Sequence, residues 1–394
     1  MSRLYIVHIG NYLIQPQSGV FQKYQAIYQA IQPHVHIEMI AFTDQSASEQ
    51  VGNVEVVGID KKNKWSAIAK WMRENLQHDD VVWLRYPFAC KGLYELTLEF
   101  GHQIVFEHNT NEQAEAIQVQ KRAWRNAAFG WRKILSKSFL SYTWSTWIAQ
   151  ISDEDRWGER CLRNVKGAIS VTLELSDKLK KRVDHYAVFV LPNCISENDF
   201  HWPESRKHSR DNNVVRMVMM IGTYDEWQGW ERILKSVKLK TNLSAKIELD
   251  IYGELPNYKG IDVNNSIHIR HFPAMSKAEM IQILPGYDLG IGTLQLYKKQ
   301  MNEACPLKVR DYWRFGIPCV MGYSDTALLQ HPELKQYNVI VPNDNSDLPW
   351  QKMIDFVQSA PASGQDDVEM FQQYKNSITY QSYALDLIGF LFKE

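Results

Sequence analysis

Short apolar runs separated by longer helical patterns recur along nearly the whole chain. In the first half these runs are residues 4–9, 35–40, 81–84, 104–106, 168–171 and 188–191. In the second half they are residues 217–221, 247–252, 267–269, 289–291, 319–321 and 339–341. This alternation is typical of βαβ units and predicts an α/β protein built on parallel sheets.

The length of the chain and one polar stretch indicate two domains. A chain of 394 residues is too long for one ordinary core. The polar residues 196–213 interrupt the apolar rhythm and are interpreted as an interdomain linker. We therefore expect a first domain over residues 1–200, a second over 201–376, and an apolar C-terminal helix over 377–394. Open α/β sheets bind ligands beyond the carboxyl ends of their strands, so two such domains facing each other would form a cleft.

Composition favours a protein of the cytoplasm. Apolar residues make up 45% of the chain and charged residues 23%, and the net charge of -1 gives no overall attraction to nucleic acid. The five cysteines are odd in number, widely spaced and without a C-x-x-C pair, which suits a reducing compartment. We find no signal-peptide pattern and no apolar run near the roughly 18 residues of a spanning helix. The sequence predicts a cytoplasmic protein, either soluble or peripheral on the inner face of a membrane.

The segment 303–320 carries the strongest functional signal. Glu303 precedes a helix expected to begin near Pro306, and Asp311 lies on that helix. The first N–H groups of a helix are unpaired and its dipole is positive there, which favours anions. Glu303 can bind sugar hydroxyls and Asp311 can accept hydrogen bonds from a ribose. The segment expected to hold the diphosphate is Cys305, Pro306, Leu307 and Lys308. The pattern suits a sugar nucleotide.

This segment resembles the E-x7-E region of retaining GT-B glycosyltransferases of the family-4 type, with Asp311 in place of the second glutamate. The resemblance implies the GT-B fold: two Rossmann-like domains facing a central cleft, with the C-terminal helix crossing back to the first. It also implies a nucleotide-diphosphate sugar of the UDP or GDP type as co-substrate, with no other cofactor. Glu303 would be the catalytic residue on the donor side.

Residues 219–230 resemble the glycine turn that holds the diphosphate in the same family. Gly222 would let the backbone approach the phosphates. The family commonly has basic residues at the next position and before the second glycine, where this chain has Thr223 and Gln228. We assign both to the donor site. Lys308 and Arg310 are the nearest candidates to neutralise a leaving diphosphate.

The acceptor side is expected in the first domain. The loop after residues 104–106 resembles the polar loop that faces the cleft in the family, and there His108 would position the acceptor hydroxyl beside Asn109. The alternative is that His108 only caps the following helix. Gly19 lies in a stretch resembling the family's glycine loop beneath the acceptor. Arg85, at another strand end, either binds an acceptor phosphate or pairs with an acid.

Two charged stretches have competing interpretations. Residues 121–147 mix basic and aromatic side chains, which suits an anionic membrane surface or a lipid-linked acceptor, although a solvated helical face is the alternative. A nucleic-acid partner is not expected. Residues 153–155 formally match a D-x-D metal motif, but their setting favours a solvated acidic cap. We therefore predict no catalytic metal.

The sequence is interpreted as a metal-independent, retaining hexosyltransferase. It would move a sugar to a hydroxyl of a glycan or lipid-linked glycan in cell-surface polysaccharide synthesis. A non-catalytic GT-B subunit that binds glycan or supports a partner transferase is the alternative, motivated by Thr223 and Gln228. A sugar-nucleotide epimerase on the same fold is a third hypothesis.

Overall fold

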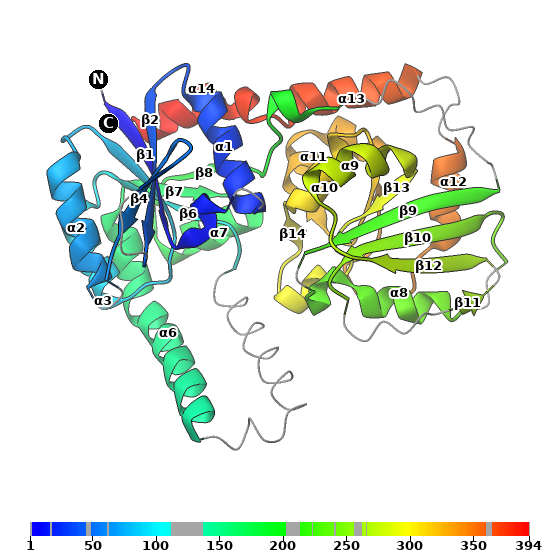
Figure 1. Cartoon of the computed structure of the whole chain (residues 1–394), viewed down its shortest axis with the longest axis horizontal. Coiled ribbons are helices and arrows are strands. Elements are labelled where there is room, and N and C mark those ends of the chain that lie inside the picture. The colour runs from blue at the N-terminus through cyan, green and yellow to red at the C-terminus, as the bar shows by residue number, and fades with distance from the viewer. Residues whose placement is uncertain are drawn as a thin grey trace. The chain divides into compact units, whose positions relative to one another are not determined.

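The computed structural model divides the chain into two compact units. Unit 1 comprises Met1–Leu191 and Tyr383–Glu394, and unit 2 comprises Pro192–Ser382. The structure describes residues 2–15, 18–44, 49–60, 63–111, 137–201, 213–222, 224–239, 242–255, 262–264, 266–359 and 365–393. Each unit contains one large sheet with helices packed on it (Figure 1).

Unit 1 is built on an eight-stranded sheet with the order β3-β4-β2-β1-β5-β6-β7-β8. The strands are β1 (Arg3–Ile9), β2 (His36–Thr43), β3 (Glu49–Val51), β4 (Val54–Gly58), β5 (Val81–Arg85), β6 (Ile104–His108), β7 (Gly167–Ser170) and β8 (Val188–Val190). The helices are α1 (Gly19–Ile31), α2 (Lys64–Asn75), α3 (Lys91–Phe100), α6 (Lys137–Asn164), α7 (Leu173–Arg182) and α14 (Tyr380–Leu391), with a 3-10 helix at Asn11–Ile14. All described pairings are parallel except that between β3 and β4.

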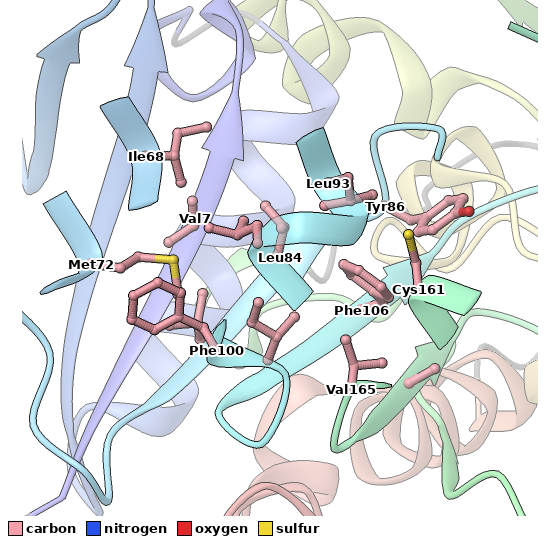
Figure 2. Packing of buried hydrophobic residues seen from close by; sticks show 14 of the residues in the cluster. Val7, Ile68, Met72, Leu84, Tyr86, Leu93, Phe100, Phe106, Cys161 and Val165 are labelled. Atoms are coloured by element: carbon pink, nitrogen blue, oxygen red, sulfur yellow. The ribbon is translucent and has the colours of Figure 1, made fainter. Parts of the chain in front are cut away.

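One hydrophobic cluster of unit 1 lies between the sheet and helices α2, α3 and α6 (Figure 2). Side chains of Val7, Leu84 and Phe106 project from neighbouring strands onto this face and are at most 3% exposed. Met72 and Leu93 pack against the same cluster from α2 and α3. Burial of such side chains contributes about 1.5–3 kcal/mol each, so this cluster fixes the strand register of the unit.

Glu154 of α6 corrects the interpretation of residues 153–155. Its carboxylate is 1% exposed and accepts hydrogen bonds of 2.9 Å from the Tyr86 hydroxyl and 2.8 Å from the Ala89 amide. Arg182 of α7 forms an ion pair with it at 2.9 Å. The expectation of a solvated acidic cap is therefore wrong for Glu154, because partners distant in sequence surround it. Asp155, one residue later, is exposed.

Unit 2 contains a seven-stranded sheet with the order β11-β12-β10-β9-β13-β15-β17 and a two-stranded sheet of β14 and β16. The strands are β9 (Val214–Ile221), β10 (Lys246–Gly253), β11 (Asp262–Asn264), β12 (Ile267–Phe272), β13 (Leu289–Ile291), β14 (Glu303–Ala304), β15 (Cys319–Met321), β16 (Ser324–Asp325) and β17 (Val339–Ile340). The helices are α8 (Trp230–Val237), α9 (Lys277–Ile283), α10 (Leu307–Trp313), α11 (Thr326–Gln330), α12 (Trp350–Ser359) and α13 (Gln365–Ser377), with 3-10 turns at Glu197–Asp199, Glu226–Gln228, Leu284–Gly286, Leu296–Lys299 and Pro332–Tyr337. Among the described pairs only β11 runs antiparallel to its neighbour.

Every apolar run predicted as a strand is a strand, with shifts of a few residues at its ends. The apolar C-terminal segment forms α14, and Phe390 of that helix packs on Phe189 with ring centroids 5.5 Å apart. All five cysteines are free thiols. Within the described ranges, no helix combines the length and apolar character that crossing a bilayer requires.

Candidate active site

The carboxyl ends of β9, β10 and β13 meet at one edge of the unit 2 sheet. β9 lies between the other two, and the chain passes from β9 to β10 on one side before reaching β13 on the other. Open parallel sheets bind ligands in the crevice at such a reversal point. Gly222 follows β9 there, and a β-carbon placed on it would meet no heavy atom within 4 Å. Its backbone is therefore open to a ligand.

A pocket of about 370 Å³ lies at this edge. Its apolar wall is formed by Met220, Trp227, Tyr252, Met275, Met280 and Leu307. Its polar side chains are Gln228, Thr293, Lys308 and Asp311. A mainly apolar cavity with a few polar groups at fixed positions is the usual construction of a small-molecule site.

Lys308 brings an ammonium group to the wall of this pocket. Its Nζ donates a hydrogen bond of 2.8 Å to Oε1 of Gln228. Burial of the ammonium group lowers the pKa of Lys308 to about 7. The amide of Gln228 is uncharged and cannot offset the loss of hydration as a carboxylate would. The ammonium group of Lys308 therefore loses its proton more readily than that of an exposed lysine.

Asp311 is held by a buried arginine one helical turn away. A guanidinium nitrogen of Arg314 lies 3.3 Å from Oδ1 of Asp311, and the Arg314 side chain is only 5% exposed. The same nitrogen is 3.6 Å from the sulfur of Met280, another pocket residue. The Arg314 guanidinium also lies over the ring of Phe315 at 5.0 Å. These contacts hold the carboxylate in one orientation at the pocket.

Tyr312 fastens α10 to the two central strands. Its hydroxyl accepts a 2.8 Å hydrogen bond from the amide of Met220 and donates to the carbonyl of Ile291 at 3.4 Å. Its ring lies so close to Gly290 that a β-carbon there would be 2.5 Å from it. The helix that carries Lys308 and Asp311 is thus fixed against the strand ends that form the rest of the pocket.

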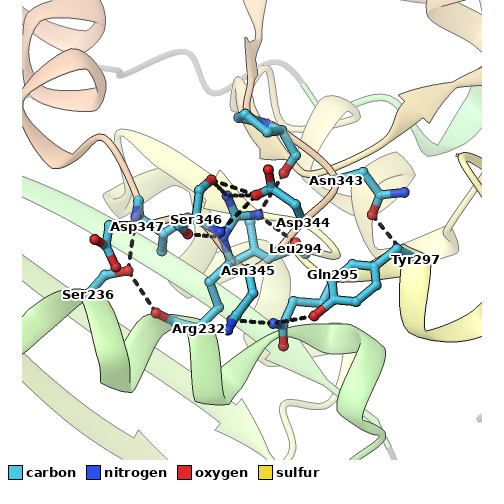
Figure 3. A network of polar contacts seen from close by, with 12 residues as sticks. Arg232, Ser236, Leu294, Gln295, Tyr297, Asn343, Asp344, Asn345, Ser346 and Asp347 are labelled. Carbon is cyan, nitrogen blue, oxygen red and sulfur yellow. Dashed lines mark hydrogen bonds and ion pairs between the residues drawn. The ribbon is translucent and has the colours of Figure 1, made fainter.

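Arg232 of α8 organises the loops beside the pocket (Figure 3). It is fully buried, and its guanidinium donates to the carbonyls of Leu294 and Pro342 at 2.7 and 2.8 Å and to that of Ser346 at 2.7 Å. The amide of Leu294 in turn donates to the carbonyl of Gln228 at 3.3 Å. Hydrogen bonds through the backbone of Leu294 therefore connect the guanidinium of Arg232 to the residue that binds Lys308.

Tyr252 is fixed by a polar network below the pocket. Its ring stacks on Phe272 with centroids 4.9 Å apart, and a 3.2 Å hydrogen bond joins its hydroxyl to that of Tyr287. Tyr287 donates to Asp250 at 2.5 Å, and Arg270 pairs with the same carboxylate at 2.6 Å. The aromatic face of Tyr252 is consequently presented in a single orientation.

Solved structures share this architecture along their full length. A glycosyltransferase from Rickettsia africae aligns over 100% of this chain and 99% of its own, with a TM-score of 0.63 and 12% identity. An alpha-glucosyltransferase in complex with UDP and a 13-mer DNA aligns over 100% of both chains, with a TM-score of 0.57 and 10% identity. The chain has the GT-B fold.

A third structure of this fold is the HepE protein of Anabaena in complex with UDP and glucose. It aligns over 99% of both chains with a TM-score of 0.57 and 10% identity. No protein-family model matches the sequence, and no curated protein matches it. The fold class predicted from the sequence is thus confirmed by structural similarity, at identities too low to transfer an activity.

Most of the residues predicted to bind the donor line the pocket. These are Gly222, Gln228, Pro306, Leu307, Lys308 and Asp311. α10 begins directly after Pro306, as predicted, and is seven residues long. Thr223 lies outside the described residues. The roles assigned to these residues remain predictions, but their spatial grouping is a finding.

Three residues of the same segment do not line the pocket. Glu303 is 5% exposed and accepts a 2.7 Å hydrogen bond from Thr326. Cys305 is buried and contacts the guanidinium of Arg310. Arg310 donates two hydrogen bonds to Asp325, at 2.9 and 2.7 Å. The guanidinium of Arg310 is therefore paired with Asp325. It is not placed to neutralise a diphosphate in the pocket, as the sequence had suggested.

The residues predicted on the acceptor side lie at the carboxyl edge of the unit 1 sheet, on two different faces. His108 is 2% exposed, and its ring centroid is 4.5 Å from that of Tyr86, on the side of α6. Asn109 accepts a 2.7 Å hydrogen bond from Lys23 of α1. Side chains alternate along a strand, which explains this division. Gly19 is the first residue of α1.

Two further expectations from the sequence concern the segment 121–147 and the absence of a catalytic metal. The basic and aromatic segment 121–147 lies outside the residues whose side chains are described. In the part of the chain that the structure covers, no group of three histidine, cysteine or acidic side chains is placed to hold a metal ion.

The sequence interpretation missed several pocket residues, among them Met275, Met280 and Thr293. They come from loops and a helix with no motif of their own. Arg314 was also missed, although its spacing of three residues from Asp311 on a predicted helix is a signal for a side-chain pair.

Proposed function

We propose that this chain is a glycosyltransferase that holds a nucleoside diphosphate sugar in the pocket of unit 2. The observation that carries the proposal is the meeting of an open glycine backbone, an ammonium group and an oriented carboxylate in one cavity. Phosphate oxygens require backbone and cationic donors, and ribose hydroxyls require an acceptor. Support comes from the similarity to glycosyltransferases of the same fold, one of them in complex with UDP.

The proposed orientation of the donor follows from the placement of these groups. The diphosphate would lie between Gly222 and Lys308, and the ribose would donate hydrogen bonds to Asp311. The base would lie against the apolar wall near Tyr252 and Met275. An anion beside Lys308 favours its charged form, so binding of the donor would increase the fraction of Lys308 that is protonated.

The proposed reaction is transfer with retention, as in family-4 enzymes. The bond between the sugar and the β-phosphate breaks while the acceptor oxygen forms a bond on the same face of the sugar. The acceptor proton passes to the departing phosphate. Glu303 would orient the transferred sugar. Its carboxylate is fixed by Thr326 at 2.7 Å, which suits a positioning role better than a nucleophilic one.

We assign the acceptor to the carboxyl edge of the unit 1 sheet, and we assign Gly19, Arg85, His108 and Asn109 to its binding. The proposed acceptor is a hydroxyl of a glycan or lipid-linked glycan in cell-surface polysaccharide synthesis. One structure of the same fold is in complex with DNA, but the net charge of -1 gives this chain no overall attraction to a polyanion. Residues 121–147 are proposed to contact the inner face of an anionic membrane.

The first test is thermal stabilisation of the purified chain by UDP, GDP, ADP and CMP, each with and without EDTA. The proposal expects one nucleoside diphosphate to raise Tm by several degrees and to do so equally in EDTA, since no metal is assigned to the site. Lys308→Met should lose most of the shift, whereas Lys235→Met, an exposed lysine of α8, should keep it. A chain that no nucleotide stabilises would contradict the donor site.

A non-catalytic GT-B subunit is the second candidate, and the uncharged Gln228 beside Lys308 is the observation that favours it. The two functions differ in turnover. A panel of nucleotide sugars with a glycan extract as acceptor should release nucleotide if the chain is an enzyme, and Glu303→Ala should reduce that release without abolishing nucleotide binding. Binding without any release, unchanged by Glu303→Ala, would favour the non-catalytic subunit.

A further inference from the structure

A second reversal point lies in unit 1, between β1 and β5. The chain runs from β1 to its neighbour β2 on one side and later reaches β5 on the other. The crevice outside the carboxyl ends of two such strands is the usual ligand position in an open parallel sheet. Arg85 closes β5 at this edge, and Asn109 and Thr110 follow β6, the next strand.

A buried ion pair lies directly beneath this edge. Nζ of Lys23 is 2.5 Å from Oε1 of Glu107, and both side chains are at most 6% exposed. Tyr24 and Trp83 donate to the other carboxylate oxygen. Burial alone would raise the pKa of Glu107, but the charge of Lys23, the hydrogen bonds from Lys23 and Tyr24, and the charge of nearby Arg85 lower it to about 2. Glu107 is thus ionised, and Lys23 is its direct ionic partner.

Arg85 adds a second cation to the same edge. It is the register partner of Glu107 in the neighbouring strand and is half-buried. Its charge acts on His8 of β1 as well: burial, followed by the charge of Arg85, lowers the pKa of His8 to about 4. His8 is therefore neutral at pH 7. Of these three described groups, Lys23 and Arg85 carry two positive charges against the one negative charge of Glu107.

Two hydrogen-bond donors at this edge are also unused. Oδ1 of Asn109 accepts from Lys23, which fixes the amide so that its Nδ2 faces elsewhere. That Nδ2 and Oγ1 of Thr110 are buried atoms without a hydrogen-bond partner among the described residues. Leaving a buried donor unpaired costs about 1–3 kcal/mol, so such groups mark positions where a ligand atom is expected.

We propose that Arg85, Asn109 and Thr110 form a subsite for an oxyanion, a phosphate or carboxylate carried by the acceptor. The guanidinium provides charge and two parallel donors, and the amide and hydroxyl provide one donor each. The inference rests on the proposed transferase function, because it takes the bound anion to belong to the acceptor. It narrows the acceptor class to acidic or phosphorylated sugars.

The test compares three probes that differ only in charge: glucose 6-phosphate, glucuronate and glucose. Calorimetry is done on the full chain saturated with UDP, so that Lys308 does not bind the probe. At least one charged probe should bind tenfold or more tightly than glucose, and the better one identifies the source of the anion. Arg85→Gln should remove this preference and leave UDP affinity within twofold, while Lys91→Gln, an exposed lysine of α3, should change neither.

Thr110→Val provides a second variant that keeps the shape of the side chain and the arginine. It should weaken the charged probe several-fold by removing one donor. Equal binding of the three probes, or a preference that survives both Arg85→Gln and Thr110→Val, overturns the subsite. Failure of UDP to bind would argue against a uridine donor instead, and the three probes then test the subsite without UDP.

Discussion

Nζ of Lys308 lies 2.8 Å from Oε1 of Gln228, so a neutral amide holds the ammonium group of the unit 2 pocket. In the family that the sequence resembles, a lysine is common at the position of Gln228. The amide accepts the hydrogen bond without cancelling the charge of Lys308. The ammonium form of Lys308 is therefore not neutralised by this partner and can pair with an anionic ligand.

Replacing Lys308 with methionine should weaken UDP binding by roughly 10- to 100-fold, which corresponds to about 1.5–3 kcal/mol for a hydrogen bond to a charged group. Binding of uridine, which lacks the diphosphate, should change less than twofold. Calorimetry with both ligands checks this. An equal loss for UDP and uridine would show that the substitution damages the pocket as a whole.

Binding of a nucleotide sugar should take up protons near neutral pH. In the free protein the pKa of Lys308 is lowered to about 7, and a bound diphosphate raises it, because an adjacent negative charge favours the ammonium form. Affinity should thus be highest below pH 7 and fall by up to about tenfold per pH unit above it. Calorimetry in buffers of different ionisation enthalpy measures the uptake. Lys308→Met should abolish both effects, and a pH-independent affinity of the unsubstituted chain would contradict the assignment.

Asp311 should account for recognition of the ribose. Asp311→Ala should lower UDP affinity by about tenfold, the cost of one or two hydrogen bonds to a charged group, and should leave 2′,3′-dideoxyuridine diphosphate nearly unaffected. Arg314→Met should act in the same direction but less strongly, because the carboxylate remains and only its orientation is lost. Fluorescence titration with the two nucleotides measures the discrimination. If both ligands lose affinity equally in Asp311→Ala, the carboxylate does not contact the ribose.

Arg232 and Lys235 lie one turn apart on α8 and should differ in their effect on stability. Arg232→Met leaves the carbonyls of Leu294, Pro342 and Ser346 without their donor, at an expected cost of about 3–5 kcal/mol in the free energy of unfolding of unit 2. Lys235 forms an exposed ion pair with Asp347 at 3.1 Å, and Lys235→Met should cost at most about 1 kcal/mol. Urea unfolding of the two variants makes the comparison. Similar unfolding midpoints for the two variants would mean that the carbonyls of Leu294, Pro342 and Ser346 find other hydrogen-bond donors.

The central strands could be predicted because they are rich in apolar residues. β9 contains the continuous apolar run 217–221, and β10 carries Ile247, Leu249 and Ile251 at alternate positions. The missed strands are different. β4 has five residues and is interrupted by Glu55, and β14 and β16 have two residues each, so none of the three gives a run that stands out from its surroundings.

The pocket was predictable where its residues fall in the two motif segments, 219–230 and 303–320. Pro306, Leu307, Lys308 and Asp311 come from one short segment, and all four line the cavity. Arg310 lies within the same segment, but its side chain is turned to Asp325. No local sequence pattern shows that these two residues form an ion pair. His108 illustrates a signal that was available: the two-residue period of a strand places it on the face opposite to Glu107 and Asn109.

The division into two units, each with its own core, has a thermodynamic consequence for any ligand of the unit 2 pocket. The pocket is assembled from Met220 through Asp311, so it exists only when β9, β10 and β13 are paired. A nucleotide bound there would be linked directly to the folding equilibrium of unit 2. Thermal unfolding of the chain then need not be a single cooperative event, and the ligand separates its steps by moving one of them.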